Sequence, residues 1–81
     1  MSNAVTFEFS KRLHLSTTTT ELCIIVGDIQ KAVKAKYGVS FDPSYSYKEM
    51  AYMTEAVDPS FAALFFLADS IWMNIEAGVR R

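Results

Sequence analysis

The sequence predicts a small α+β domain, in which an N-terminal β-strand or hairpin precedes three α-helices and the C-terminal helix is central. Two observations lead to this class. Apolar and polar residues alternate near the N-terminus, which is typical of a half-buried strand. Three later segments carry apolar residues at helical spacing, and each of them follows residue types that commonly begin helices. The 81 residues are expected to form one domain.

The predicted strand covers residues 4–16, where odd positions are apolar and even positions are polar. The odd set is Val5, Phe7, Phe9, Leu13 and Leu15, and the even set is Thr6, Glu8, Ser10, Arg12 and His14. Lys11 breaks the alternation and would mark a bulge, an edge or a turn between two short antiparallel strands. A single strand leaves backbone groups unpaired. We therefore expect it to pair with the same strand of a second copy.

The first helix is predicted over residues 19–37. Thr18 and Glu21 have the spacing of a capping box, and Gly38 is a suitable end. The apolar residues between them share one helical face: Leu22, Ile25, Val26, Ile29, Val33 and Tyr37. An alternative makes residues 22–26 a second strand, with Asp28 beginning a shorter helix, because this run is rich in β-branched residues.

Two further helices are predicted in the second half of the chain. Ser46 and Glu49 form a second capping box, which favours a helix over residues 47–57. Asp58 and Pro59 then have the residue types that begin a helix, and Gly78 would end it. A wide apolar arc of this last helix is predicted to face the core: Phe61, Leu64, Phe65, Leu67, Ala68, Ile71, Trp72, Ile75 and Val79.

Several apolar or small residues fall outside these core-facing stripes and predict a partner or subunit interface. They are Phe66 and Met73 in the last helix, and Cys23, Ile24 and Gly27 in the first. A chain this short often needs a disulfide, a metal or oligomerisation for stability. One cysteine cannot form an internal disulfide, so we expect a homodimer or a higher even oligomer.

A cluster of tyrosines and methionines predicts a groove for a partner or a small ligand. Both residue types are enriched at protein interfaces. The cluster could equally close the core around Trp72. Its members are Tyr45, Tyr47, Met50, Tyr52 and Met53.

Catalytic and metal-binding patterns are not found in the sequence. His14 has no Ser, Cys or carboxylate partner in a motif, and Cys23 has no second cysteine nearby. We expect His14 to be a surface residue and Cys23 to behave as a small buried apolar residue. The chain is therefore predicted to be no enzyme and to need no cofactor or metal.

The net charge of −1 gives no overall basic field for nucleic acid. Lys11, Arg12, Lys31 and Lys34 could form a modest basic patch, although a solvated helix face is the simpler interpretation. No apolar run approaches the roughly 20 residues that span a bilayer. The N-terminus lacks the pattern of a signal peptide. We expect no membrane association and a cytoplasmic location.

These observations favour a non-enzymatic, homo-oligomeric interaction protein that binds another macromolecule, with a protein as the expected partner. Short chains without catalytic motifs often belong to phages or other mobile elements, as accessory proteins or inhibitors of host machinery. A DNA-binding regulator that uses a dimeric β-ribbon is an alternative. A small-ligand binder built on the tyrosine and methionine cluster is a second alternative.

Overall fold

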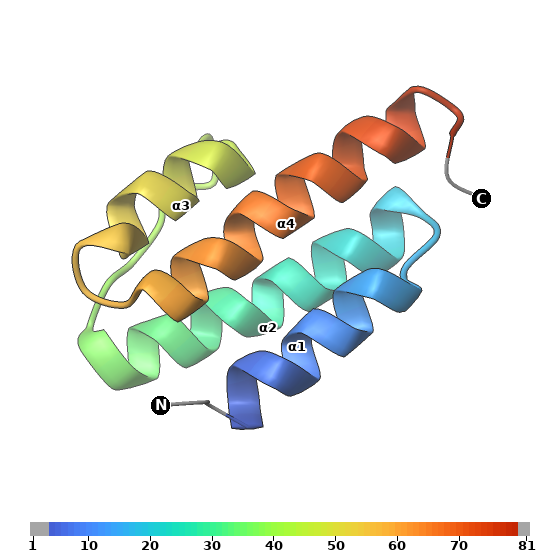
Figure 1. Cartoon of the computed structure of the whole chain (residues 1–81). Coiled ribbons are helices and arrows are strands. Elements are labelled where there is room, and N and C mark those ends of the chain that lie inside the picture. The colour runs from blue at the N-terminus through green and yellow to red at the C-terminus, as the bar shows by residue number, and fades with distance from the viewer. Residues whose placement is uncertain (1–3, 80–81) are drawn as a thin grey trace.

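The computed structural model describes residues 4–79, which contain four α-helices and no β-strand. Helix α4 packs against each of the other three helices. Helices α1 and α2 lie side by side, and α3 lies along the first half of α4 (Figure 1). The prediction of an α+β fold with an N-terminal strand is therefore wrong. The helices are α1 (Ala4–Leu15), α2 (Thr19–Tyr37), α3 (Tyr47–Glu55) and α4 (Pro59–Glu76).

Helix α1 replaces the predicted strand because its alternating pattern also fits a helix. In an alternating pattern, apolar residues recur every two positions and therefore also every four positions. Residues four apart share one face of a helix. Phe9 and Leu13 are related in this way and pack on the core, where Leu13 is fully buried. Phe7 and Lys11 share another face, where the Lys11 ammonium lies 5.5 Å from the centre of the Phe7 ring. The helix satisfies its backbone groups internally, so no second strand is needed.

Helix α2 has the predicted bounds, and its capping box is formed. The Glu21 backbone N–H donates to the Thr18 hydroxyl oxygen at 3.1 Å, and the Thr18 N–H donates to the Glu21 carboxylate at 3.1 Å. Hydrogen bonds from Thr17 and Thr18 lower the pKa of Glu21. Gly38 ends the helix with a left-handed φ of 73°. The alternative of a strand over residues 22–26 is wrong.

Helices α3 and α4 also begin where the sequence predicts. The Ser46–Glu49 capping box is formed, and α3 ends at Glu55, two residues before the predicted end. The Asp58 carboxylate accepts a hydrogen bond from the Ser60 N–H at 2.9 Å and so caps α4. Pro59 is the first residue of that helix.

All four helices contribute to one hydrophobic core. Helix α1 supplies one buried residue to it, whereas α2 and α4 supply most of the others. The Cα envelope measures 34 × 28 × 17 Å, so the body is only about two helices thick. The buried core residues are Leu13, Leu22, Ile25, Val26, Ile29, Val33, Met50, Ala51, Phe61, Leu64, Phe65, Ala68 and Ile71.

Candidate functional site

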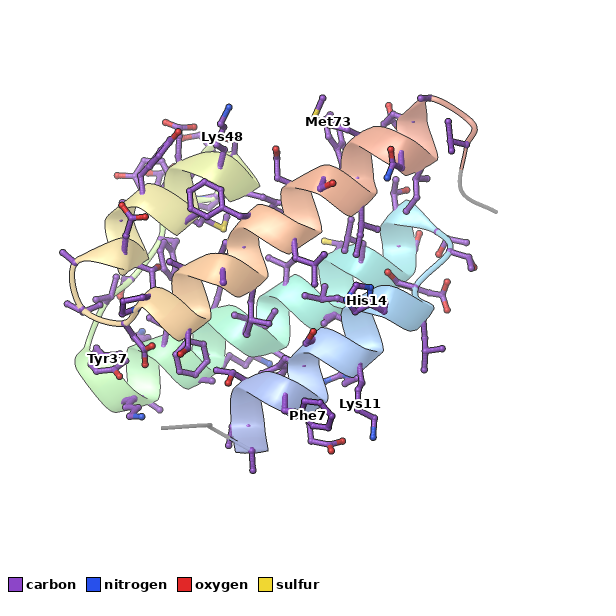
Figure 2. The ribbon with its side chains drawn as sticks, viewed as in Figure 1. Phe7, Lys11, His14, Tyr37, Lys48 and Met73 are labelled. Atoms are coloured by element: carbon purple, nitrogen blue, oxygen red, sulfur yellow. The ribbon has the colours of Figure 1, made fainter. Side chains whose placement is uncertain are left out.

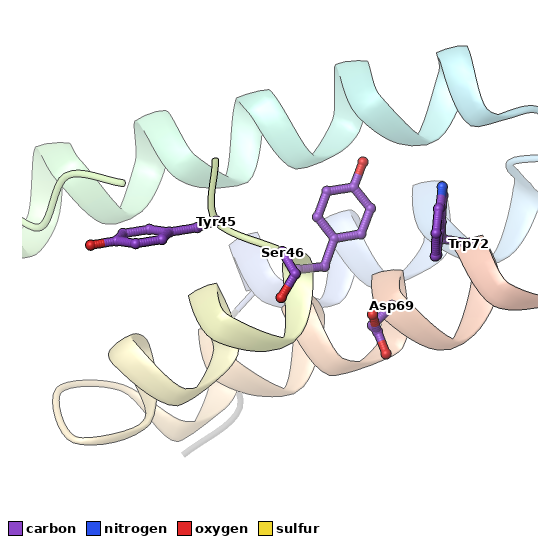
Figure 3. Close-up of a pocket in the computed structure, with 5 residues that line it drawn as sticks. Tyr45, Ser46, Asp69 and Trp72 are labelled. Atoms are coloured by element: carbon purple, nitrogen blue, oxygen red, sulfur yellow. The ribbon is translucent and has the colours of Figure 1, made fainter. Parts of the chain in front are cut away.

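Two adjoining pockets form a groove between α2, the start of α3 and the second half of α4. The smaller pocket has a volume of about 240 Å³ and the larger one of about 460 Å³. Tyr47 and Trp72 line both pockets, so the two lie next to each other. We call this surface the aromatic groove. The smaller pocket is lined by Tyr45, Ser46, Tyr47, Asp69 and Trp72 (Figure 3), and the larger by Thr19, Thr20, Cys23, Ile24, Tyr47 and Trp72.

The start of α3 places the two tyrosines of the aromatic groove. The Asp42 carboxylate accepts hydrogen bonds from the Ser44 N–H at 2.8 Å and from its hydroxyl at 2.7 Å, which lower the pKa of Asp42. The Tyr45 N–H donates to the Asp42 carbonyl at 3.0 Å. The capping box at Ser46 then fixes where Tyr47 enters the helix. Local hydrogen bonds therefore hold this edge of the groove in place.

Helix α4 places Asp69 and Trp72 on one face, because residues three apart are neighbours on a helix surface. The sequence predicts Trp72 in the core-facing arc, and the structure corrects this. Phe61 and Phe65 in that arc are buried, but Trp72 is 42% exposed. Helix α3 has nine residues and α4 has 18, so α3 covers only about half the length of α4. The Trp72 side chain lies in the half that α3 does not cover.

Helix α2 presents the third edge of the groove through residues that lie outside its buried stripe. Cys23 is exposed, so the expectation that it behaves as a buried residue is wrong. Ile24 is 59% exposed. Burial, and to a smaller extent the neighbouring Cys23, raise the pKa of Tyr47, and both residues line the larger pocket. Apart from its chain neighbours and the backbone of its own helix, no atom lies within 4 Å of the position that a Cβ at Gly27 would take.

The predicted interface strip on α4 is divided. Phe66 is half-buried and packs against the core, and its ring makes an edge contact with Tyr52 of α3 at 5.4 Å. Met73 is exposed and points away from the body of the molecule (Figure 2). The two residues therefore do not form one free surface. Cys23 and Ile24, by contrast, border the aromatic groove.

The predicted tyrosine and methionine cluster is also divided. Tyr45 and Tyr47 line the aromatic groove. Met50 is buried in the core, where its sulfur accepts a hydrogen bond from the Gln30 amide at 3.1 Å. Tyr52 and Met53 are exposed on α3 and line neither pocket of the groove.

Two of the four cations in the predicted basic patch are paired with carboxylates. The Arg12 guanidinium lies 2.9 Å from the Asp28 carboxylate, and the Lys11 ammonium lies 3.7 Å from that of Glu8. Lys31 and Lys34 instead border a separate pocket beside residues 39–41. Half of the predicted basic patch is therefore partly neutralised by neighbouring carboxylates.

Side chains that commonly bind metals do not gather in the described part of the chain. Residues 4–79 contain no set of three or more His, Cys, Asp or Glu side chains that could hold a metal ion. His14 is exposed on α1, as expected. No helix in the same range is long and apolar enough to cross a membrane.

Sequence reasoning missed Asp69, Thr19 and Thr20 as groove residues. The spacing of Asp69 and Trp72 was visible in the sequence, but their position opposite Tyr47 depends on how α3 packs on α4. The chain matches no protein-family model, and searches of curated proteins and of solved structures give no significant match. Fold and site together define a small all-helical protein with an exposed aromatic groove.

Proposed function

We propose that this protein is a non-enzymatic interaction protein that binds a protein partner through the aromatic groove. The observation that supports the proposal is the convergence of exposed apolar side chains on one concave surface. Ile24 of α2 and Trp72 of α4 are far apart in the sequence, yet both line the larger pocket. Isolated apolar residues are common on protein surfaces, whereas several around one groove are typical of a binding site.

The composition of the groove fits a protein partner. Tyrosine and tryptophan combine a large apolar area with a polar group at one end, and both are enriched at binding hot spots. The threonines of α2 and Ser46 add hydrogen-bonding groups at the edge of the groove. An apolar centre with a polar rim is the usual arrangement of a protein interface. The proposal places the protein in the cytoplasm.

DNA binding through a β-ribbon is not part of this proposal. Residues 4–15, which would have formed the ribbon, are helical. Arg12, which would have faced DNA, lies beside Asp28, and Lys11 of the predicted basic patch lies beside Glu8. A small ligand in the groove is a weaker candidate, because only two of the five tyrosine and methionine residues line it.

A matched pair of substitutions tests the proposal by affinity capture. Ile24 and Phe7 are both 59% exposed, but only Ile24 lines the aromatic groove. We expect Ile24→Glu to weaken the binding of a captured partner at least about tenfold, because the new carboxylate would lose water at the contact. Phe7→Glu should bind that partner as the wild-type protein does. The binding is measured by titrating the purified partner against each variant.

The opposite pattern would contradict the proposal. A partner that binds Ile24→Glu normally, or that is lost with Phe7→Glu, does not use the aromatic groove. Circular dichroism of both variants shows whether they retain the helical fold.

A further inference from the structure

The Asp69 carboxylate lies in the smaller pocket without a cationic partner. Figure 3 shows it between Ser46 and Trp72. Within residues 4–79, the ion pairs join Glu8 to Lys11 and Arg12 to Asp28. Asp69 is half-buried, so it has lost part of its hydration without gaining a charged neighbour. A cation brought into this pocket would restore that interaction.

The aromatic walls of the pocket favour the same sign of charge. Tyr45, Tyr47 and Trp72 all line it. The face of an aromatic ring carries negative charge density and attracts cations within about 6 Å of the ring centre, most strongly for tryptophan. Carboxylate and rings therefore both favour a positive ligand and disfavour an anion.

The size of the pocket and its surroundings indicate which cation fits. At about 240 Å³ it is smaller than the roughly 300–1,000 Å³ of sites for drug-sized ligands, so it suits one side chain. Lysine and arginine have apolar stems that can lie along Tyr47 and Trp72 while the charged end reaches Asp69. The larger pocket beside it, lined by Ile24, offers room for a neighbouring apolar side chain.

We propose that the smaller pocket of the aromatic groove binds a lysine or arginine side chain of a protein partner, with its cation on Asp69 and its stem against Trp72. This inference rests on the proposed function and specifies the chemistry of the contact. The partner segment would carry a basic residue next to an apolar one, so that one residue enters each pocket.

Trp72 fluorescence provides a direct test, because it is the sole tryptophan of the chain. The probes are two blocked dipeptides, acetyl-Lys-Leu-amide and acetyl-norleucine-Leu-amide, which differ in the ammonium group of the first side chain. We expect the lysine peptide to bind about fivefold more tightly, which corresponds to about 1 kcal/mol for an exposed cation site. Choline serves as a third probe for a free small-molecule cation.

Two substitutions that each remove one negative charge distinguish an effect of the pocket from an effect of the protein's net charge. Asp69→Asn should reduce the advantage of the lysine peptide, because only the rings then attract the cation, and it should leave the norleucine peptide unaffected. Glu55→Gln is the control. Glu55 lies eight residues beyond Tyr47 in α3, about 12 Å along the helix, and lines neither pocket of the groove. This variant should bind both peptides like the wild-type protein.

The inference is overturned by equal binding of the two peptides to the wild-type protein, by no binding of either, or by an Asp69→Asn variant that prefers lysine as strongly as the wild-type protein does. Binding of choline without the lysine peptide would overturn the assignment to a protein side chain. Capture of a partner by the wild-type protein and its loss with Ile24→Glu do not depend on these results. Failure of this inference is thus distinguishable from failure of the proposed function.

Discussion

Asp58 connects the end of α2 to the start of α4. One carboxylate oxygen caps α4 through the Ser60 N–H at 2.9 Å, and the other accepts a hydrogen bond from the Tyr37 hydroxyl. The Tyr37 ring also makes an edge contact with Phe61 at 6.4 Å. The hydrogen bond from Tyr37 is the largest cause of the lowered pKa of Asp58, and the same bond raises the pKa of Tyr37.

These shifts predict how stability depends on pH. The pKa of Asp58 is lower in the folded protein than its usual value of 3.8. Its stabilising contribution is therefore complete above that value and is lost as the pH falls through the lower, folded pKa. We expect Tyr37→Phe to lower stability at neutral pH and to differ less from the wild-type protein in acid. Urea unfolding of both proteins at neutral and acidic pH measures the difference.

The difference in free energy of unfolding between the two proteins should shrink in acid. A difference that stays the same at acidic pH would contradict a role for the charged Asp58 carboxylate. Comparison with Tyr37→Phe cancels the titration of the other carboxylates, which both proteins share.

At the scale of elements, α1 shows why alternation alone is a weak signal in a short segment. Phe9 and Leu13 belong equally to one face of a strand and to one face of a helix. The alternating set also includes Phe7 and Leu15, which are exposed in the helix. A strand in residues 4–16 would have needed a neighbour to pair with, and the described residues that follow contain helices and loops but no strand. Packing of Leu13 on the core is compatible with a helix that pairs its own backbone.

Two glycines, one inside α2 and one just after its last residue, should respond in opposite ways to substitution. Gly27 is inside the helix and, apart from its chain neighbours and the helix backbone, has no atom within 4 Å of an added Cβ, so Gly27→Ala should stabilise the protein by about 1 kcal/mol. Gly38 has a φ of 73°, where an L side chain is strained, so Gly38→Ala should destabilise it by about 1 kcal/mol. Chemical unfolding of each variant measures both changes. A loss of stability in Gly27→Ala would show that another segment packs on this face.

At the scale of the whole molecule, the total exposed surface is ordinary. The 5074 Å² of accessible surface is close to the roughly 4,900 Å² that the size scaling gives for a 9.1 kDa monomer. The argument that an unpaired strand requires a second copy no longer holds, because residues 4–15 are helical. The prediction of a homodimer now depends on how the exposed apolar groups are distributed, mainly around Ile24 and Trp72.

Light scattering tests that prediction. If the aromatic groove pairs two copies, the wild-type protein should have twice the mass of the 9.1 kDa chain at micromolar concentration. Ile24→Glu should then scatter as a monomer and Phe7→Glu as a dimer. We also expect a protein partner and a second copy to exclude each other, because both would cover the same face. A monomeric wild-type protein would contradict self-association and leave the groove to another protein.

The sequence by itself determined three of the four helices, because the signals that begin and end them act over a few residues. Thr18 with Glu21, Ser46 with Glu49, and Asp58 with Pro59 each form contacts inside one turn. Apolar stripes at helical spacing then identified most of the core.

Only the tertiary structure decided the form of α1 and the location of the site. The aromatic groove joins Ile24, Tyr47 and Trp72, which come from three helices. Whether Trp72 is covered depends on the length of α3 and on where it lies along α4, and neither is written near Trp72 in the sequence. Local patterns fix which face of a helix is apolar, but the packing of the other helices fixes which part of that face meets solvent.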